Sequence, residues 1–252
     1  MKGCVKMGKT LFDELKSFSQ IGFREIYRKF IYIHCRELMD IIFPDELDDS
    51  ITGLIAYCYI DRTEGISFRP FMVSVMKEDT LQVFNMPHQD DTIYVLRLRD
   101  GETKMSELHD GDKHMYLYAV DPVKYSFFDL SIVNFDTESF IEIKEHIDEN
   151  YSAGDMVEEF RSEKYAFLDK YRNEFYPDDV QTLLYSEKNG IEQVWVRLTF
   201  MTMNDEIFGE LLNEPYQDYG CHEGTLIELT EAKAGDDKVL VFTGRMAEKK
   251  KE

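Results

Sequence analysis

Residues 192–215 read EQVWVRLTFMTMNDEIFGELLNEP and contain the only tryptophan of the chain. In their first half apolar side chains alternate with Trp195, Arg197 and Thr199, which predicts a strand with one buried face. The apolar series consists of Val194, Val196, Leu198 and Phe200. The segment therefore predicts a β architecture for the part of the chain around it.

The second half of the segment predicts a hairpin with an abrupt end. Asn204-Asp205 is typical of a tight turn, and residues 207–212 supply the returning strand. Gly209 inside that strand indicates a bulge or the close approach of another chain segment. Asn213 tolerates a left-handed backbone and Pro215 cannot donate to a ladder, so the strand must stop there.

The surrounding sequence predicts a small domain over residues 151–252. The turn-forming segment 150–155 marks the boundary, and Asp155 is a suitable N-cap for a leading helix. That helix has Met156, Phe160, Phe167 and Tyr171 at helical spacing. Strands are expected at 180–186, 192–203, 206–212, 225–230 and 238–243, which together form a strongly bent sheet.

The hairpin pattern, W-V-x-[VL] followed by G-x-L-x-N-x-P, resembles the YegJ-like bacterial domain of unknown function over about residues 155–243. It is also similar to small β domains among predicted immunity proteins of bacterial toxin systems. The positions that carry the resemblance are Trp195, Val196, Gly209, Leu211, Asn213 and Pro215. Two features depart from the family: Gly224-Thr225 replaces a Gly-Asp turn, and a terminal Asp-Trp is missing.

The resemblance implies no established catalytic activity, and it therefore favours a bacterial binding or interaction module. A protective, immunity-like role with a toxin as partner is a special case of that interpretation. The candidate binding residues are Trp195, Arg197, Gly209, Asn213 and Pro215. The same residues can equally build the hairpin alone, and the sequence leaves both interpretations open.

Residues 1–150 predict a separate N-terminal domain. Thr10 and Asp13 form a capping-box pattern before a short helix over Leu11, Leu15 and Phe18. A second helix is expected from Ile26 to Ile42, where apolar residues recur at steps of three and four until Pro44. From residue 51 short β-rich runs alternate with short connections, which favours a mainly antiparallel sheet. Residues 136–151 predict another helix, with Phe140, Ile143 and Ile147 on one face. The expected fold class is therefore α+β, with N-terminal helices packed on a sheet.

The charge excludes some partners. The chain carries 29 Lys/Arg and 50 Asp/Glu, a net charge of −21, and both predicted domains are acidic. Such a surface repels nucleic acids and anionic membranes and attracts a basic protein, although acidity also serves solubility alone. No apolar run approaches the roughly 18 residues of a membrane helix. We therefore expect a cytoplasmic protein with a basic protein partner, and the sequence leaves a homo-oligomer open.

The motifs of common enzymes are weak in this chain. Gly3, Gly8, Lys9 and Thr10 fit the phosphate-binding pattern G-x-x-x-x-G-K-[ST], and a nucleotide-binding protein or enzyme is the alternative function. Only two residues precede Gly3, so we expect no strand to deliver the chain into such a loop. The four widely spaced cysteines predict reduced thiols, and adjacent Cys221 and His222 are not expected to converge.

Neither a cofactor nor a metal site is expected. The six histidines lack paired-ligand spacing. The densest carboxylate clusters, residues 45–49 and Asp178-Asp179, are interpreted as solvated faces.

Overall fold

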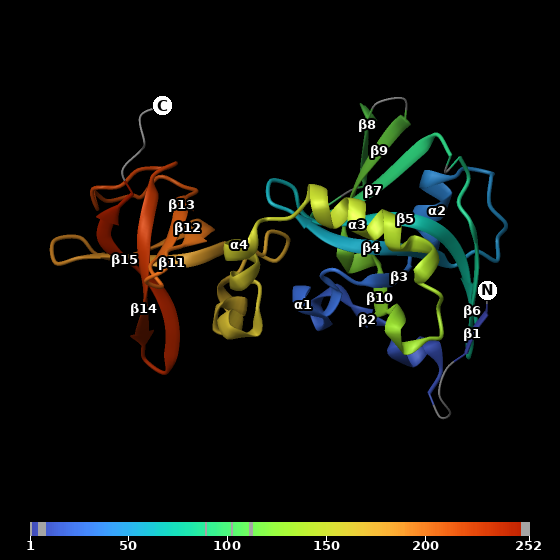
Figure 1. Cartoon of the computed structure of the whole chain (residues 1–252), viewed down its shortest axis with the longest axis horizontal. Helices are drawn as coiled ribbons and strands as arrows, with labels where there is room; N and C mark the ends of the chain where they lie inside the picture. The colour runs from blue at the N-terminus through green and yellow to red at the C-terminus, as the bar shows by residue number, and fades with distance from the viewer. Residues whose placement is uncertain (1, 5–8, 89, 102, 111–112, 248–252) are drawn as a thin grey trace. The chain divides into compact units, whose positions relative to one another are not determined.

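The computed structural model describes residues 2–4, 9–88, 90–101, 103–110 and 113–247. It divides the chain into two compact units, Met1–Ser152 and Ala153–Glu252, so the break lies within the turn-forming segment 150–155. Strands hold 44% of the residues and helices 22% (Figure 1). The predicted α+β class with N-terminal helices packed on a sheet is wrong, because the protein is mostly β and its helices are few and short.

The N-terminal unit contains a ten-stranded sheet. Its strands are β1 (Lys2–Cys4), β2 (Lys16–Ser17), β3 (Phe30–His34), β4 (Gly53–Asp61), β5 (Gly65–Met76), β6 (Thr80–Asn85), β7 (Thr92–Leu98), β8 (Lys104–Asp110), β9 (Lys113–Val120) and β10 (Ser126–Asp129). Its helices are α1 (Phe23–Ile26), α2 (Arg36–Ile42) and α3 (Ile141–Asn150). Short 3-10 turns cover Leu11–Glu14, Phe18–Gln20, Pro122–Lys124, Leu130–Ile132 and Glu138–Phe140.

The predicted helix over residues 26–42 is broken: its C-terminal part, Arg36–Ile42, is helical as α2, but Phe30–His34 form strand β3. Apolar residues match a helical period there, but Ile31, Tyr32 and Ile33 are consecutive and all buried. A strand that is covered on both faces buries consecutive residues, whereas a surface helix buries only one stripe. Because β3 lies between β10 and β4, its β-branched and aromatic side chains are placed as a central strand requires.

The path β2-β10-β3-β4-β5-β7-β9-β8 forks at the long strand β5. Ser67 and Phe68 pair with β7, whereas Met72–Met76 pair with β6, which in turn pairs with β1. Pro70 lies between the two pairings, beside a register shift against β4. Proline has no N–H for a ladder and is found at edges and bulges, so it suits the position where the sheet divides.

Two further elements of this unit are helix α3 and strand β8. The predicted helix at 136–151 is present as α3, and Ile147 is buried with Phe140 and Ile143 packed against the same core. Tyr57 Oη donates to Asp148 Oδ1 at 2.8 Å, which fastens α3 to β4. Strand β8 (Lys104–Asp110) pairs antiparallel with β9.

The C-terminal unit is a closed five-stranded barrel rather than a bent open sheet. Its strands are β11 (Asp179–Ser186), β12 (Gly190–Met201), β13 (Ile207–Leu211), β14 (Leu226–Ala234) and β15 (Asp237–Met246). Successive strands are antiparallel, so the first and the fifth run in the same direction and close the barrel in parallel at Leu183 and Val241. Register shifts between β12 and β13 and between β14 and β15 bend the strands, as closure requires.

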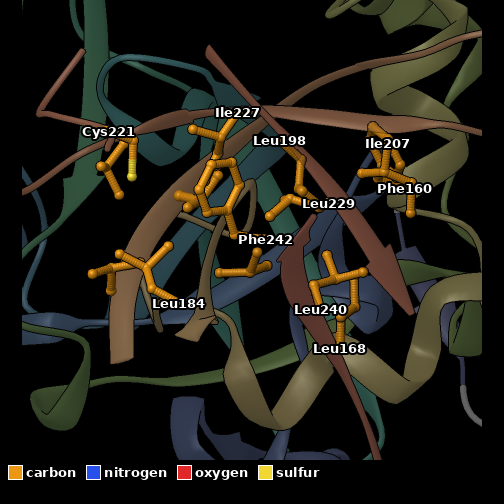
Figure 2. Close-up of a cluster of buried hydrophobic side chains, with 14 of the residues drawn as sticks. Phe160, Leu168, Leu184, Leu198, Ile207, Cys221, Ile227, Leu229, Leu240 and Phe242 are labelled. Atoms are coloured by element: carbon orange, nitrogen blue, oxygen red, sulfur yellow. The ribbon is translucent and has the colours of Figure 1, made fainter. Parts of the chain in front are cut away.

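Helical segments complete the barrel core. The predicted single leading helix is α4 (Asp155–Phe160) followed by a 3-10 segment, Glu163–Tyr171. Figure 2 shows Phe160 and Leu168 from these segments beside side chains of the barrel strands, all in one buried cluster. The helical segments therefore pack on the barrel and share its core.

The tryptophan-containing segment 192–215 forms most of the β12–β13 hairpin. Val194, Val196 and Leu198 are buried while Trp195 and Arg197 are partly exposed, so the predicted alternation is confirmed as far as Leu198. It ends at the register shift between Leu198 and Phe200, and Phe200 is only partly buried. Asp205 N donates to Thr202 O at 3.0 Å, which centres the turn one residue earlier than expected. Asp205 itself takes the left-handed φ of 60°.

Among the described residues, no helix combines the length and apolar composition that crossing a bilayer would require.

Candidate functional site

Four of the residues predicted for binding make contacts within the barrel or are buried in it. Arg197 donates from Nε and Nη2 to the two carboxylate oxygens of Asp179, at 2.6 and 2.8 Å. The hydrogen bond to Asp179 raises the pKa of Arg197. Asn213 Oδ1 accepts a 2.8 Å hydrogen bond from Trp195 N, so its amide continues the ladder where β13 ends. Pro215 follows and is buried.

Glycine is required at position 209 because there is no room for a side chain, not because of the backbone angle. A Cβ at this position would lie 2.3 Å from Val196 Cγ1 and 3.0 Å from Arg197 O. Both values are shorter than an ordinary van der Waals contact of about 3.5–4 Å. The predicted close approach of a second chain segment is confirmed, and that segment is β12.

Asp178 and Asp179 contradict the prediction of a solvated acidic face. Asp178 receives two hydrogen bonds from Arg161, from Nε at 2.9 Å and from Nη2 at 2.7 Å. The side chains of this pair are only 2% and 3% exposed. A planar guanidinium facing a carboxylate makes two parallel charge-assisted bonds. The two aspartates therefore anchor the segment that leads into β11, one to Arg161 and the other to Arg197.

The residues of the alternative nucleotide site are only partly described. Gly8 lies outside the described residues, and Gly3 lies inside the three-residue strand β1, which pairs antiparallel with β6. β1 therefore overlaps the motif and does not precede it. Lys9 lies 3.6 Å from Glu14, and Thr10 forms a capping box with Asp13. The helix expected after Thr10 is a single 3-10 turn, Leu11–Glu14. A phosphate-binding loop uses the N-terminus of a full helix, which this turn does not provide.

Cys221 and His222 also point to different partners. Cys221 is free and buried, and burial raises the pKa of its thiol. His222 Nδ1 lies 2.7 Å from Glu214 Oε1, and this hydrogen bond raises the pKa of the histidine. Cys35 and Cys58 are likewise free and buried, and the side chain of Cys4 lies outside the described part. Cys221 and His222 therefore do not form a thiolate–imidazole pair.

The barrel contains a groove of about 540 Å³ that the sequence did not predict. It lies along β13, β14 and the end of β15, beside Lys164 and Tyr165 of the 3-10 segment. The residues that line it are Lys164, Tyr165, Asn204, Asp205, Glu206, Ile207, Glu228, Leu229, Thr230, Glu231, Thr243 and Arg245. Four of these are acidic and two are basic, so carboxylates are in excess.

Glu228 is the least exposed carboxylate of the groove. Its side chain is 7% exposed, and its Oε1 lies 2.7 Å from Arg245 Nη2. Glu206 Oε1 lies 3.9 Å from Nη1 of the same guanidinium. The sequence analysis did not predict a role for Glu228, because it is a single polar position in the strand sequence LIEL. A charged residue between two apolar neighbours is the signal that could have identified it.

The two basic residues of the groove are both engaged. Lys164 Nζ lies 3.2 Å from Glu159 Oε1, and this hydrogen bond raises the pKa of the lysine. Arg245 bridges Glu206 and Glu228. In the described part of the chain Asp205 has no ion-pair partner within 4 Å.

The chemistry of this groove is that of cation binding. Carboxylates at its walls accept hydrogen bonds from an ammonium or guanidinium group, and Tyr165, Ile207 and Leu229 offer apolar surface to the stem of such a side chain. Within the described ranges no three His, Cys, Asp or Glu side chains converge as a metal site would require. No family model, curated protein or solved structure matches this chain, so the groove is interpreted from its own residues.

Proposed function

We propose that this chain is a non-enzymatic binding module whose barrel takes a basic segment of another protein in the groove around Glu228. The observation that carries the proposal is the buried Glu228 carboxylate, which already holds a guanidinium group. A buried carboxylate requires a cationic or hydrogen-bonding partner, since an unpaired one is strongly destabilising. A basic side chain is the chemistry that meets this requirement.

The net negative charge of the C-terminal unit also favours a basic protein partner. Residues 153–252 carry 12 Lys/Arg and 22 Asp/Glu, a net charge of −10. A net negative field of this size attracts basic proteins and speeds their association at low salt. The groove would then select among them by shape and by its apolar surface.

The biological setting that we propose is the cytoplasm of a bacterium. The buried free thiols of Cys35, Cys58 and Cys221 are consistent with a reducing compartment. The resemblance of residues 155–243 to the YegJ-like domain and to immunity proteins suggests a toxin as one kind of basic partner. Growth rescue on co-expression with a toxin encoded beside this protein is the corresponding genetic test.

The direct test is calorimetric titration of the full chain with a synthetic peptide in which arginine and lysine alternate with glycine. We expect saturable binding that weakens by at least about tenfold between 50 and 300 mM salt. The double variant Glu206→Gln/Glu228→Gln should weaken binding by a further factor of about ten, or about 1.4 kcal/mol.

The control is Asp236→Asn, which removes an exposed carboxylate outside the groove. It should leave the affinity within about twofold of the wild type. If Asp236→Asn and the groove variant weaken binding equally, the peptide is held by overall charge and the proposed site is wrong.

A further inference from the structure

The end of strand β15 carries a bulge that places Arg245 in the groove. Leu229 pairs with Phe242 and Ile227 pairs with Met246, so the single residue Glu228 faces three residues of β15. The central one is Gly244, whose φ of 86° lies in the left-handed region that favours glycine. The bulge turns the chain so that the Arg245 side chain lies over Glu228.

The contact between these two side chains is asymmetric. Arg245 is 68% exposed, whereas the carboxylate that it contacts is 7% exposed. An exposed arginine has high rotamer freedom and gains little from a surface ion pair. The buried carboxylate, by contrast, needs a cation next to it. The cation is therefore the exchangeable member of the pair.

The geometry also selects among cations. Two different nitrogens of one guanidinium face the two carboxylates: Nη2 lies 2.7 Å from Glu228 Oε1, and Nη1 lies 3.9 Å from Glu206 Oε1, an ion-pair contact without a hydrogen bond. Guanidinium is a planar fork that can direct separate N–H groups to separate acceptors. A lysine ammonium is a compact point charge with one nitrogen, so it cannot place separate nitrogens toward the two carboxylates.

We propose that Glu206 and Glu228 form an arginine-recognition subsite, which Arg245 occupies in the free protein and which an arginine side chain of the basic partner takes over. This inference rests on the proposed function and specifies its ligand as an arginine-bearing segment. Arg245 then competes with the partner, so its removal strengthens binding of arginine.

The test uses full-length Arg245→Ala with ethylguanidinium as the probe, followed by NMR titration and thermal unfolding. We expect saturable binding to Arg245→Ala that raises its Tm, and at least about tenfold weaker binding to the wild type. Ethylammonium should bind Arg245→Ala at least about tenfold more weakly than ethylguanidinium. Adding Glu228→Gln to Arg245→Ala should abolish the saturable response.

The matched control is Lys233→Ala, because Lys233 is an exposed cation of β14 and its loss gives the same net charge. An arginine-glycine peptide should bind Arg245→Ala several-fold more tightly than it binds Lys233→Ala. Equal affinities for the two variants would mean that only net charge changed, and the subsite would be refuted.

The outcomes separate the subsite from the proposed function. Saturable ethylguanidinium binding to Arg245→Ala without any peptide binding supports the subsite and refutes the basic-partner function. Peptide binding that depends on Glu206 and Glu228 but does not distinguish arginine from lysine supports the function and refutes the subsite. A folded Arg245→Ala that binds neither probe overturns both.

Discussion

Replacement of Gly209 by alanine should destabilise the barrel through one identified clash. The new Cβ would lie 2.3 Å from Val196 Cγ1, more than 1 Å inside an ordinary contact, and 3.0 Å from Arg197 O. To relieve this clash, strands β12 and β13 must separate or the Val196 side chain must move out of the core. Overpacking of this kind costs about 2–3 kcal/mol.

A second substitution tests the cause. Val196→Ala alone should cost about 2 kcal/mol, because it removes buried methyl groups and leaves a cavity. In Gly209→Ala/Val196→Ala the closest clashing atom is gone, so the double variant should lose about 2–3 kcal/mol instead of the sum of the single losses. The expected coupling is about 2 kcal/mol, within the range known for residues in contact.

The assay is urea unfolding of the full chain followed by fluorescence of Trp195. This residue is the only tryptophan and lies next to Val196 in β12, so the signal reports the barrel rather than the N-terminal unit. Strictly additive losses in the double variant would show that the steric account of Gly209 is wrong. A loss below about 0.5 kcal/mol for Gly209→Ala would show the same.

Three further predictions concern polar groups. Thr182 Oγ1 is buried in the barrel without a hydrogen-bond partner in the described chain, so Thr182→Val should raise stability by about 1 kcal/mol in urea unfolding; a loss of that size would contradict this account. Asp178→Ala leaves the buried Arg161 guanidinium without that carboxylate and should cost about 3–5 kcal/mol, whereas a loss near zero would show that the pair is not buried in solution. The pKa of His222 is raised and that of Glu214 is lowered by their hydrogen bond, so the pair stabilises the fold most between about pH 4.5 and 6.5; the stabilisation falls as the pH drops through the folded pKa of Glu214 or rises through that of His222. The loss of stability in His222→Gln should therefore be larger at pH 5.5 than at pH 8.5, and a pH-independent loss would refute the linkage.

Features that depend on local pattern could be predicted from the order of the residues alone. Alternation at Val194, Val196 and Leu198 identified a strand with one buried face, because a strand turns successive side chains to opposite sides. The missing side chain of Gly209 indicated a bulge or a close approach of another segment, and the ring of Pro215 indicated the end of the strand. Neither prediction required knowledge of a distant residue. The turn-forming segment 150–155 identified the break between the two units for the same reason.

The sequence failed where a pattern fits two structures or where partners are remote along the chain. Apolar residues of 26–42 fit a helical period, and it is pairing with β10 along one edge and with β4 along the other that makes Phe30–His34 a central strand. Asp178 reads as a solvated acid until Arg161, 17 residues earlier, meets it in the interior. No local signal states which charged residue has a buried partner.

The candidate site depends on tertiary contacts and could not be predicted from the sequence. Glu206, Glu228 and Arg245 lie near the ends of three different strands, and nothing in their spacing predicts a common groove. Pairing of β13 with β14 and of β14 with β15, together with the bulge at Gly244, brings them together. Local conformation follows from neighbours in sequence, whereas a binding groove depends on which strand ends meet, and that is determined by packing of the whole core.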